Sequence, residues 1–301
     1  MSERIKIRHW LIIALLSIIW GTSYILMKKG LEYFSIYQIG SLRIIITAVC
    51  LLPVSIRHLA LVNRKNIVSI AVIGLFGSGI PAFLFPLAQT RIDSSLAGML
   101  NSLSPAFTLI FGILLYRNKV IKSQVAGVFL GLIGAAGLLY SGSFTFNFYG
   151  LFVVLATILY GISSNEVSRV QNINGIKITA LAFFFLLPMG ITTLLITGLH
   201  PVNNDEEWIK GLFYIAVLSV AGSALALALF YYLIRETSPV FASMTTYLIP
   251  IVATLWGILD GERLLPSMLV SVLIILAGVY LINRPSFREK IKRMMQNMQL
   301  L

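Results

Sequence analysis

The sequence predicts an all-α integral membrane protein with ten transmembrane helices arranged as two inverted five-helix repeats. Three observations predict this fold class: a very apolar composition, the lengths of the apolar runs, and a repeat that relates the two halves of the chain. Of the 301 residues, 58% are hydrophobic and only 11% are charged. Because an ordinary soluble domain has about 25% charged residues, we expect lipid to cover most of this chain.

Ten apolar runs are each long enough to cross a bilayer, since a helix needs about 20 mostly apolar residues to span the hydrocarbon core. The connections between them are short, which leaves no room for a separate soluble domain. The first run begins after only nine residues and no small-residue cleavage site is evident, so we interpret it as a membrane helix and not as a signal peptide. The runs are residues 10–28, 36–56, 67–89, 94–116, 122–141, 149–168, 178–199, 209–234, 239–259 and 264–283.

Basic residues indicate the orientation of the runs. With the N-terminus in the cytoplasm, the cytoplasmic segments carry 17 lysines and arginines and the outer segments carry 5. Such an excess is typical of the cytoplasmic face. We therefore expect both termini in the cytoplasm, although Lys28 and Lys29 on the outer side oppose this orientation. The expected location is a bacterial plasma (inner) membrane. Because the net charge of +12 follows the topology, the lipid bilayer and not nucleic acid is the expected partner.

Residues 284–301 form a basic cytoplasmic tail. Its pattern fits a short helix on anionic lipid, and equally a solvated segment that only sets the topology. The single cysteine, Cys50, lies inside the second run without a disulfide or metal partner, so we interpret it as a small apolar filler.

A weak repeat relates the two halves of the chain, residues 1–141 and 148–283. At a shift of 145 residues, "SPAFTLIFGILLYR" aligns with "IPIVATLWGILDGE", which places Pro105 on Pro250. At a shift of 140, "SIIWGTSY" aligns with "TILYGISS", which places Trp20 on Tyr160. Each half contains five runs, an odd number, so the second half enters the membrane from the opposite side. Two inverted copies are a known transporter architecture.

Pro105 and Pro250 are hinge candidates because they occupy matching places in the two halves. A proline frees a backbone carbonyl and bends its helix, which neighbouring helices tolerate in a membrane. Paired bends at a repeat interface suit a rocking transporter, and a static kink is the alternative. We interpret the Gly-Glu pair at 261–262 simply as the end of a helix at the outer surface.

Four segments carry a family resemblance: "WGTSYILMK", "SLRIIITA", "SSLAGMLNSLSPAFTLIFGILLY" and "SPVFASMTTYLIPIVATLWGILDGERLL". They resemble the drug/metabolite transporter superfamily in its ten-helix EamA-type branch. The fourth segment is the most specific, whereas the first half has Tyr116-Arg117-Asn118 where Gly-Glu-Arg is usual. The resemblance implies a central cavity between the inverted units, and export or exchange of small metabolites. It does not name the metabolite.

Polar and aromatic side chains inside the runs predict a substrate cavity. Helical spacing places Trp20, Ser23 and Tyr24 on one stripe of the first run, and the repeat places Tyr160 and Ser164 on the sixth. Hydroxyl groups in lipid need partners, so these stripes should face protein or a wet cavity suited to a small amphipathic solute. The alternative is hydrogen bonding between helices plus interfacial aromatics. The remaining candidates are Phe85, Gln89, Asn101, Ser104, Tyr231, Tyr232 and Tyr247.

Lysines and arginines lie almost entirely outside the apolar runs, and Arg43 is the clear exception. A charge at the centre of the membrane costs about 2.5–3.5 kcal/mol on the insertion scale. It could snorkel outward or pair with helix-end carbonyls, and the resemblance favours a structural anchor over a substrate ligand. Glu166 is expected at the inner end of its helix.

The runs contain no carboxylate or histidine near mid-span, so a buried proton relay is not expected. No P-loop or HExxH motif is present, and we expect no catalytic residue, metal or cofactor. The sequence thus predicts a secondary transporter of amino acids or similar amphipathic solutes, working by alternating access. A nucleotide-sugar or sugar exchanger and a membrane-embedded enzyme are the alternatives.

The run at 122–141 contains a GxxxG pair, which permits close backbone approach between helices. We expect it to pack within the monomer near Ser271 and Gly278. A homodimer contact is the alternative, so the chain is expected to be a monomer or a homodimer.

Overall fold

The computed structural model describes residues 6–117, 121–140, 147–199 and 208–282, so the basic tail at 284–301 lies outside the described residues. Every predicted run forms helix, and the described residues contain no strand, which confirms the all-helical prediction. The first-half helices are α1 (Ile7–Leu31), α2 (Ile36–His58), α3 (Ile67–Gly74), α4 (Pro81–Gln89), α5 (Ser94–Leu100), α6 (Ser104–Leu114) and α7 (Lys122–Leu139). The second-half helices are α8 (Gly150–Arg169), α9 (Gly175–Thr197), α10 (Trp208–Ser219), α11 (Ala226–Glu236), α12 (Pro239–Ala242), α13 (Ile249–Leu259) and α14 (Pro266–Ile282).

Nine segments of the described chain are long and apolar enough to cross a membrane. The tenth, α14, is a shorter apolar helix of 17 residues. Backbone polar groups have no water partner in lipid, so an apolar run can satisfy them only by forming a helix. Polar residues set the ends: Ser35 caps α2 by accepting from Gln38 N at 3.3 Å, and Asn174 caps α9 in the same way.

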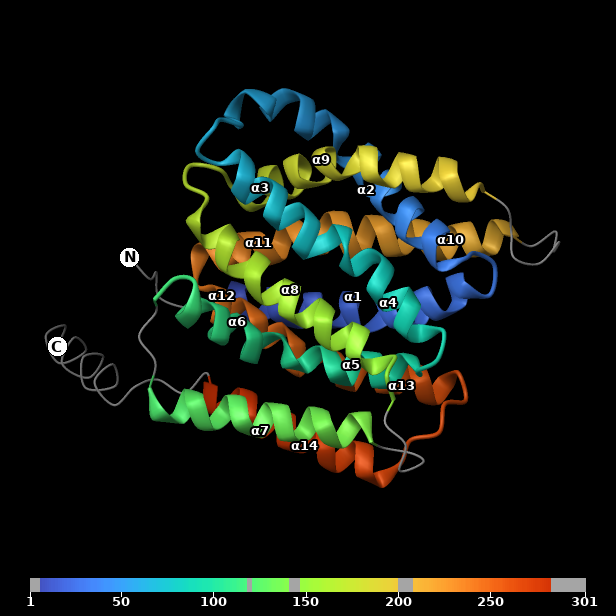
Figure 1. The fold of residues 1–301 in the computed structure, drawn as a ribbon, viewed down its shortest axis with the longest axis vertical. Coiled ribbons are helices and arrows are strands. Elements are labelled where there is room, and N and C mark those ends of the chain that lie inside the picture. Colours follow the sequence, from blue (N-terminus) through green and yellow to red (C-terminus); the bar gives the residue numbers. More distant parts are fainter. Residues whose placement is uncertain (1–5, 118–120, 141–146, 200–207, 283–301) are drawn as a thin grey trace, which may run out of the picture.

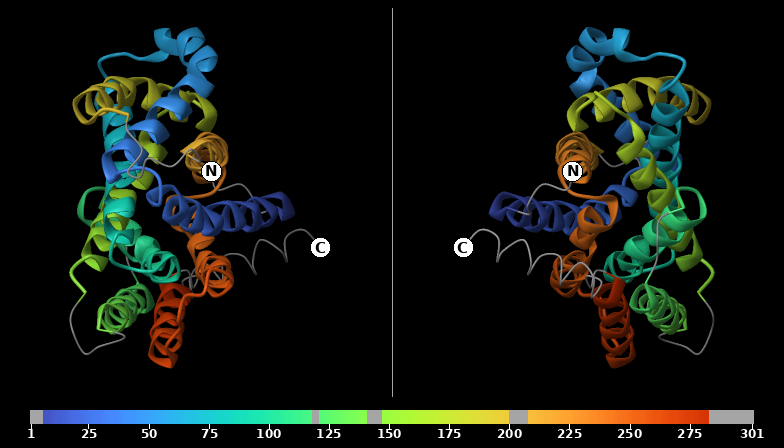
Figure 2. Two further views of the ribbon diagram at one scale, coloured as in Figure 1. Left: turned by 90° about the vertical axis from the view of Figure 1, so that its right-hand side faces the viewer. Right: turned by 90° about the vertical axis from the view of Figure 1, so that its left-hand side faces the viewer.

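Many helices run lengthwise across the view of Figure 1, with α1 and α8 near the middle, whereas α3 and α4 slant across them. Helices α2 and α9 pack against each other toward one edge of the molecule, and α7 and α14 pack against each other at the opposite edge (Figure 2). The beginning of α1 and the end of α14 lie at the same end of the bundle, on the left of Figure 1.

The α7–α14 contact is a close approach of two backbones. A Cβ added at Gly127 would lie 2.4 Å from the carbonyl oxygen of Gly278, and one at Gly134 would lie 2.7 Å from the carbonyl oxygen of Ser271. The glycines of α7 are therefore used within the monomer, as their spacing predicted. Cys50, which was interpreted as a small apolar filler, is exposed on α2 beside the exposed Val49, so it fills no space between the described helices.

Four of the long segments change helix type part-way along their length. Residues 75–79 and 220–225 form π-helices, between α3 and α4 and between α10 and α11. Residues 101–103 and 243–247 form 3₁₀-helices that precede α6 and α13. A shift of 145 residues carries both ends of α6 onto both ends of α13.

Pro105 and Pro250 lie in the first turns of α6 and α13, directly after these breaks. Proline is tolerated there because the first amide groups of a helix have no intrahelical acceptor. Each proline thus restarts a helix after a 3₁₀ segment and does not kink its middle. Their role as hinges stays a prediction. Pro53, Pro86 and Pro188 lie inside α2, α4 and α9.

Candidate substrate cavity

A cavity lies among the central helices and reaches both π-helical segments. Counted together with the open space at its edge, it occupies about 770 Å³. The lining is mainly aromatic and hydroxyl-bearing, and it comes from both halves of the chain. It consists of Trp20, Ser23, Tyr24, Met27, Arg43, Gly77, Phe85, Asn101, Ser104, Thr108, Tyr160, Ser163, Ser164, Gly222, Leu227, Phe230, Tyr231, Ser243 and Thr246.

The structure places nine of the twelve candidate residues in this lining and three elsewhere. Gln89 is buried and donates from Nε2 to the carbonyl oxygen of Tyr24 at 3.0 Å, so its amide links α4 to α1. Tyr247 packs at the margin of the hydrophobic core. Tyr231 lines the cavity and Tyr232 does not, because successive residues of a helix point about 100° apart. The part of the lining residues in substrate binding stays a prediction.

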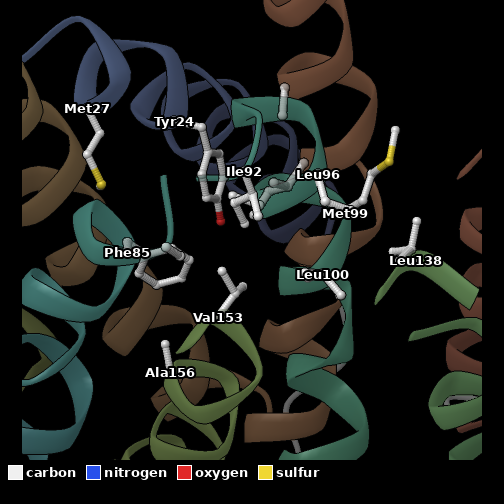
Figure 3. Packing of buried hydrophobic residues seen from close by; sticks show 14 of the residues in the cluster. Tyr24, Met27, Phe85, Ile92, Leu96, Met99, Leu100, Leu138, Val153 and Ala156 are labelled. Atoms are coloured by element: carbon white, nitrogen blue, oxygen red, sulfur yellow. The ribbon is translucent and has the colours of Figure 1, made fainter. Parts of the chain in front are cut away.

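Two aromatic pairs form parts of the wall. The ring of Trp20 from the first half meets that of Phe230 from the second, with centroids 5.0 Å apart in an edge-to-face arrangement. At the positions matched by the repeat, Tyr160 from the second half stacks on Phe85 from the first at 5.9 Å. Tyr24 also meets Phe85 at 5.7 Å, and Figure 3 shows these two side chains pointing toward one another.

The π-helical segments bring glycines against serines of the opposite half. A Cβ on Gly222 would lie 2.7 Å from Ser23 Oγ, and a Cβ on Gly77 would lie 2.5 Å from Ser163 Oγ. A π-helix also leaves backbone carbonyls available to other donors, and Trp20 Nε1 donates to the carbonyl oxygen of Gly222 at 2.9 Å. The indole N–H is therefore used to position the ring.

Several lining residues were missed by reasoning from the sequence. Phe230 is the repeat partner of Phe85, and Gly77 and Gly222 are repeat partners of each other, so the repeat contained a signal for all three. Arg43 was interpreted as a structural anchor. In the structure it lines the cavity, and its Nε donates to Ser223 Oγ at 2.8 Å. No sequence signal showed which way this side chain faces.

A buried carboxylate ties the two halves together at the end of the bundle where α1 finishes. The side chain of Glu262 is only 1% exposed and binds Lys28 Nζ at 2.8 Å. It also accepts from the backbone N–H groups of Ser94 and Ser95, at 2.9 and 3.0 Å, at the start of α5. Asp260 joins the cluster by pairing with Lys28 at 2.7 Å. The helix does end beside the Gly-Glu pair, since α13 finishes at Leu259, but no sequence signal indicated that the Glu262 side chain joins the two halves.

The pKa of Glu262 reflects these contacts. Burial acts to raise this pKa, but hydrogen bonds from Lys28, Ser95 and Ser94 outweigh burial and lower it to about 2. The carboxylate thus stays ionised across the physiological pH range, and its charge is matched by Lys28 and by the N-terminus of α5.

A second polar cluster joins the halves at the opposite end, where α8 finishes. Glu166 accepts a hydrogen bond from Ser69 Oγ at 2.5 Å and another from the hydroxyl of Tyr116. Arg169 lies over the Tyr116 ring, 5.2 Å from its centroid. Glu166 is at this end of its helix, as its position in the run predicted, and it links α8 to first-half residues.

The EamA-like transporter family model matches residues 8–140 and again residues 147–284. The chain belongs to this family. Members of the EamA-like family are therefore the proteins with which it should be compared.

Three relatives match this EamA-like chain over most of its length. It is 25% identical to a protein of Archaeoglobus fulgidus named "Uncharacterized transporter", over 92% of this chain and 99% of that one. It is 26% identical to the "Uncharacterized inner membrane transporter YedA" of Escherichia coli K12, over 88% of this chain and 90% of that one. It is 24% identical to the "S-adenosylmethionine/S-adenosylhomocysteine transporter" of Chlamydia trachomatis, over 92% of this chain and 90% of that one.

A solved structure described as "Crystal structure of protein" shares the fold, with a TM-score of 0.64 at 16% identity over 93% of this chain and 97% of that one. Family membership and the names of the relatives make this EamA-like chain an integral membrane transporter with a small-molecule substrate.

Proposed function

We propose that the chain is a secondary transporter that moves amino acids or similar amphipathic solutes by alternating access. The observation that carries the proposal is the cavity, whose aromatic and hydroxyl-bearing wall is shared between the two halves. Aromatic faces can hold the apolar part of a solute while hydroxyl groups orient its polar end. Export and facilitated exchange are the directions that we propose.

We also propose that residues 1–141 and 148–283 are inverted repeats of one five-helix unit. Reciprocal contacts between the halves support this arrangement. The repeat matches Gly21 with Gly161 and Phe107 with Val252. In the structure Gly21 lies against Val252 and Gly161 lies against Phe107, so each glycine meets the partner from the opposite half. The Trp20–Phe230 and Tyr160–Phe85 pairs are related in the same way. Such exchanged pairs are what a two-fold axis between the halves produces.

Alternating access requires the two ends of the cavity to open in turn. The Glu262 cluster joins α1 and α5 of the first half to the end of α13 in the second, and the Glu166 cluster joins α3 to α8 at the other end. Because both clusters connect the halves, a rocking motion must loosen one while it keeps the other.

The substrate class follows from the charge of the lining. A nucleotide sugar carries several negative charges and should need several basic residues, whereas Arg43 is the one basic residue among the described lining residues. A solute with one charged end and an apolar body fits better. The Chlamydia relative is named for solutes that carry an amino-acid group, which supports this choice.

The test is uptake by proteoliposomes that contain the purified full-length chain, with radiolabelled amino acids, amines and nucleotide sugars offered in turn. We expect saturable uptake of at least one amino acid or related amphipathic solute. Saturable uptake of a nucleotide sugar with none of the amino acids would favour the exchanger. The absence of any uptake, together with turnover of an added solute, would favour a membrane-embedded enzyme.

The proposed orientation places both termini in the cytoplasm. In a Cys50→Ser background, Thr90→Cys in the exposed connection after α4 should react with an impermeant thiol reagent added to intact cells. Asn63→Cys in the exposed connection after α2 should react only after the cells are opened. The reverse pattern of labelling would invert the orientation.

A further inference from the structure

Arg43 is a membrane-embedded cation whose charge is not matched by the protein around it. Its helix, α2, lies in a segment apolar enough to span the membrane. Within the described part of the chain, the ion pairs involve other residues, and no carboxylate lies within salt-bridge distance of Arg43. An ionisable residue at such a place indicates function when it faces an interior cavity.

Other basic residues near the ends of the bundle behave differently. Lys28 and Lys29 pair with Asp260 at 2.7 and 2.8 Å, and Arg8 pairs with Glu236 at 2.6 Å. These basic side chains, which have a structural role, are each neutralised by a carboxylate of the chain. Arg43 instead meets neutral groups: Nε donates to Ser223 Oγ at 2.8 Å, and the phenols of Tyr24 and Tyr160 line the same cavity.

The hydrogen bonds of Arg43 leave part of the guanidinium available to the cavity. A guanidinium has five N–H donors, and the bond to Ser223 occupies the one on Nε. Among the described residues, no acceptor is bound by the two terminal amino groups, and Arg43 belongs to the cavity lining. Two parallel N–H groups on a planar fork match the two oxygens of a carboxylate.

The surroundings of this cation set its preference for an anion. The described lining contains no aspartate or glutamate, so Arg43 makes the cavity positive. In an apolar wall this charge acts over a low dielectric, which strengthens its attraction for an anionic group. The single positive charge of Arg43 balances one negative charge on the solute. The aromatic pair Trp20 and Phe230 supplies apolar surface for the rest of the solute.

We infer that Arg43 binds the carboxylate of the transported solute, with the hydroxyl groups of Tyr24 and Tyr160 as additional donors, so the preferred solutes are monocarboxylates with an apolar body. Ser223 positions the guanidinium from the π-helix at 220–225. The inference rests on the proposed function, because it assigns a role to a residue of the same cavity.

The test compares acids with their amides on the purified full-length protein in detergent. The probes are L-phenylalanine with L-phenylalaninamide and L-methionine with L-methioninamide, and ligand-induced thermal stabilisation gives the apparent Kd. Each amide keeps the apolar side chain and the amino group but lacks the anion. We expect the native protein to be stabilised by at least one acid and not by its amide. Arg43→Gln should weaken binding of that acid roughly tenfold or more, because it removes a charged hydrogen-bond donor.

Further variants keep the test decisive. Arg57→Gln removes an exposed arginine from the same helix and should bind like the native protein. Arg43→Lys keeps the positive charge but loses the two parallel N–H groups of the guanidinium. It should bind the acid more weakly than the native protein and more tightly than Arg43→Gln. If Arg43→Gln does not fold, Arg43→Lys takes its place in the test. Equal stabilisation by acid and amide, stabilisation by neither, or native affinity for the acid in both Arg43 variants would overturn the inference.

The binding assay also separates this inference from the proposed function. If liposomes take up only solutes without a carboxylate, and the acids do not bind, the transporter proposal stands and the assignment of Arg43 fails. If acid binding depends on Arg43 but no solute is taken up, Arg43 remains a carboxylate-binding residue while the transporter proposal fails.

Discussion

Trp20→Ala is expected to lower the rate of solute uptake more than tenfold while the protein still folds and inserts. The indole is a half-buried wall of the cavity, held by its hydrogen bond to the Gly222 carbonyl and by the Phe230 ring. If the cavity binds solute as proposed, this substitution removes an aromatic surface against which the solute packs. Aromatic contacts of this kind are typically among the strongest in a binding site. Uptake by proteoliposomes, with the amount of folded protein measured by size-exclusion chromatography, tests this expectation.

Two variants sharpen the result. Trp10→Ala removes a tryptophan of the same helix that is 46% exposed and lies against Phe241 at 5.4 Å, so it should transport normally. Tyr160→Phe keeps the ring that stacks on Phe85 and removes only the hydroxyl, so it tests the polar part of the wall. If Trp20→Ala transports like the native protein, or is inactive only because it does not fold, Trp20 serves packing and does not bind solute.

Glu262→Gln is expected to destabilise the protein by about 3 kcal/mol, which corresponds to a fall of roughly 5–10 °C in the unfolding temperature. The substitution leaves the shape of the side chain but removes the charge that Lys28 and the N-terminus of α5 share. Breaking a buried ion pair by removing one partner costs about 3–5 kcal/mol. Lys28 keeps Asp260 as a partner, which places the effect at the lower end of the range for such pairs.

Glu32→Gln is the matched control, since Glu32 pairs with Lys29 at 2.9 Å but is 50% exposed. An exposed pair contributes at most about 1 kcal/mol, so this variant should unfold near the native temperature. Thermal unfolding of the purified variants in detergent measures both effects. Equal unfolding temperatures for Glu262→Gln and Glu32→Gln would show that the Glu262 cluster does not stabilise this end of the bundle.

The stabilisation by Glu262 should also depend on pH in one direction. The pKa in the folded protein is about 2, below the usual value of 4.5. Folding therefore favours the ionised form, and the contribution is complete above about pH 4.5 and is lost as the pH falls toward 2. The difference in unfolding temperature between the native protein and Glu262→Gln should shrink over this acid range. A difference that stays constant from pH 7 to the acid limit would contradict the assigned role of the charge.

The sequence by itself determined the helices of this protein. Apolar runs in lipid must satisfy their own backbone hydrogen bonds, so the distribution of apolar residues located the helices approximately: the runs at 67–89 and 239–259 agree with the spans, whereas the run at 10–28 forms the longer helix Ile7–Leu31. Helical spacing also located the candidate stripe of Trp20, Ser23 and Tyr24, because the helical period places residues three and four apart on one face.

Only the tertiary structure decided where polar side chains point and which distant groups they meet. Tyr231 and Tyr232 carry the same ring, and the rotation of α11 against its neighbours selects the first for the cavity. Arg43 meets Ser223, 180 residues away, and Glu262 meets Ser94, 168 residues away. The physical reason is that hydropathy and period describe each helix separately, whereas the partner of a buried charge depends on the packing of helices that are far apart in the chain.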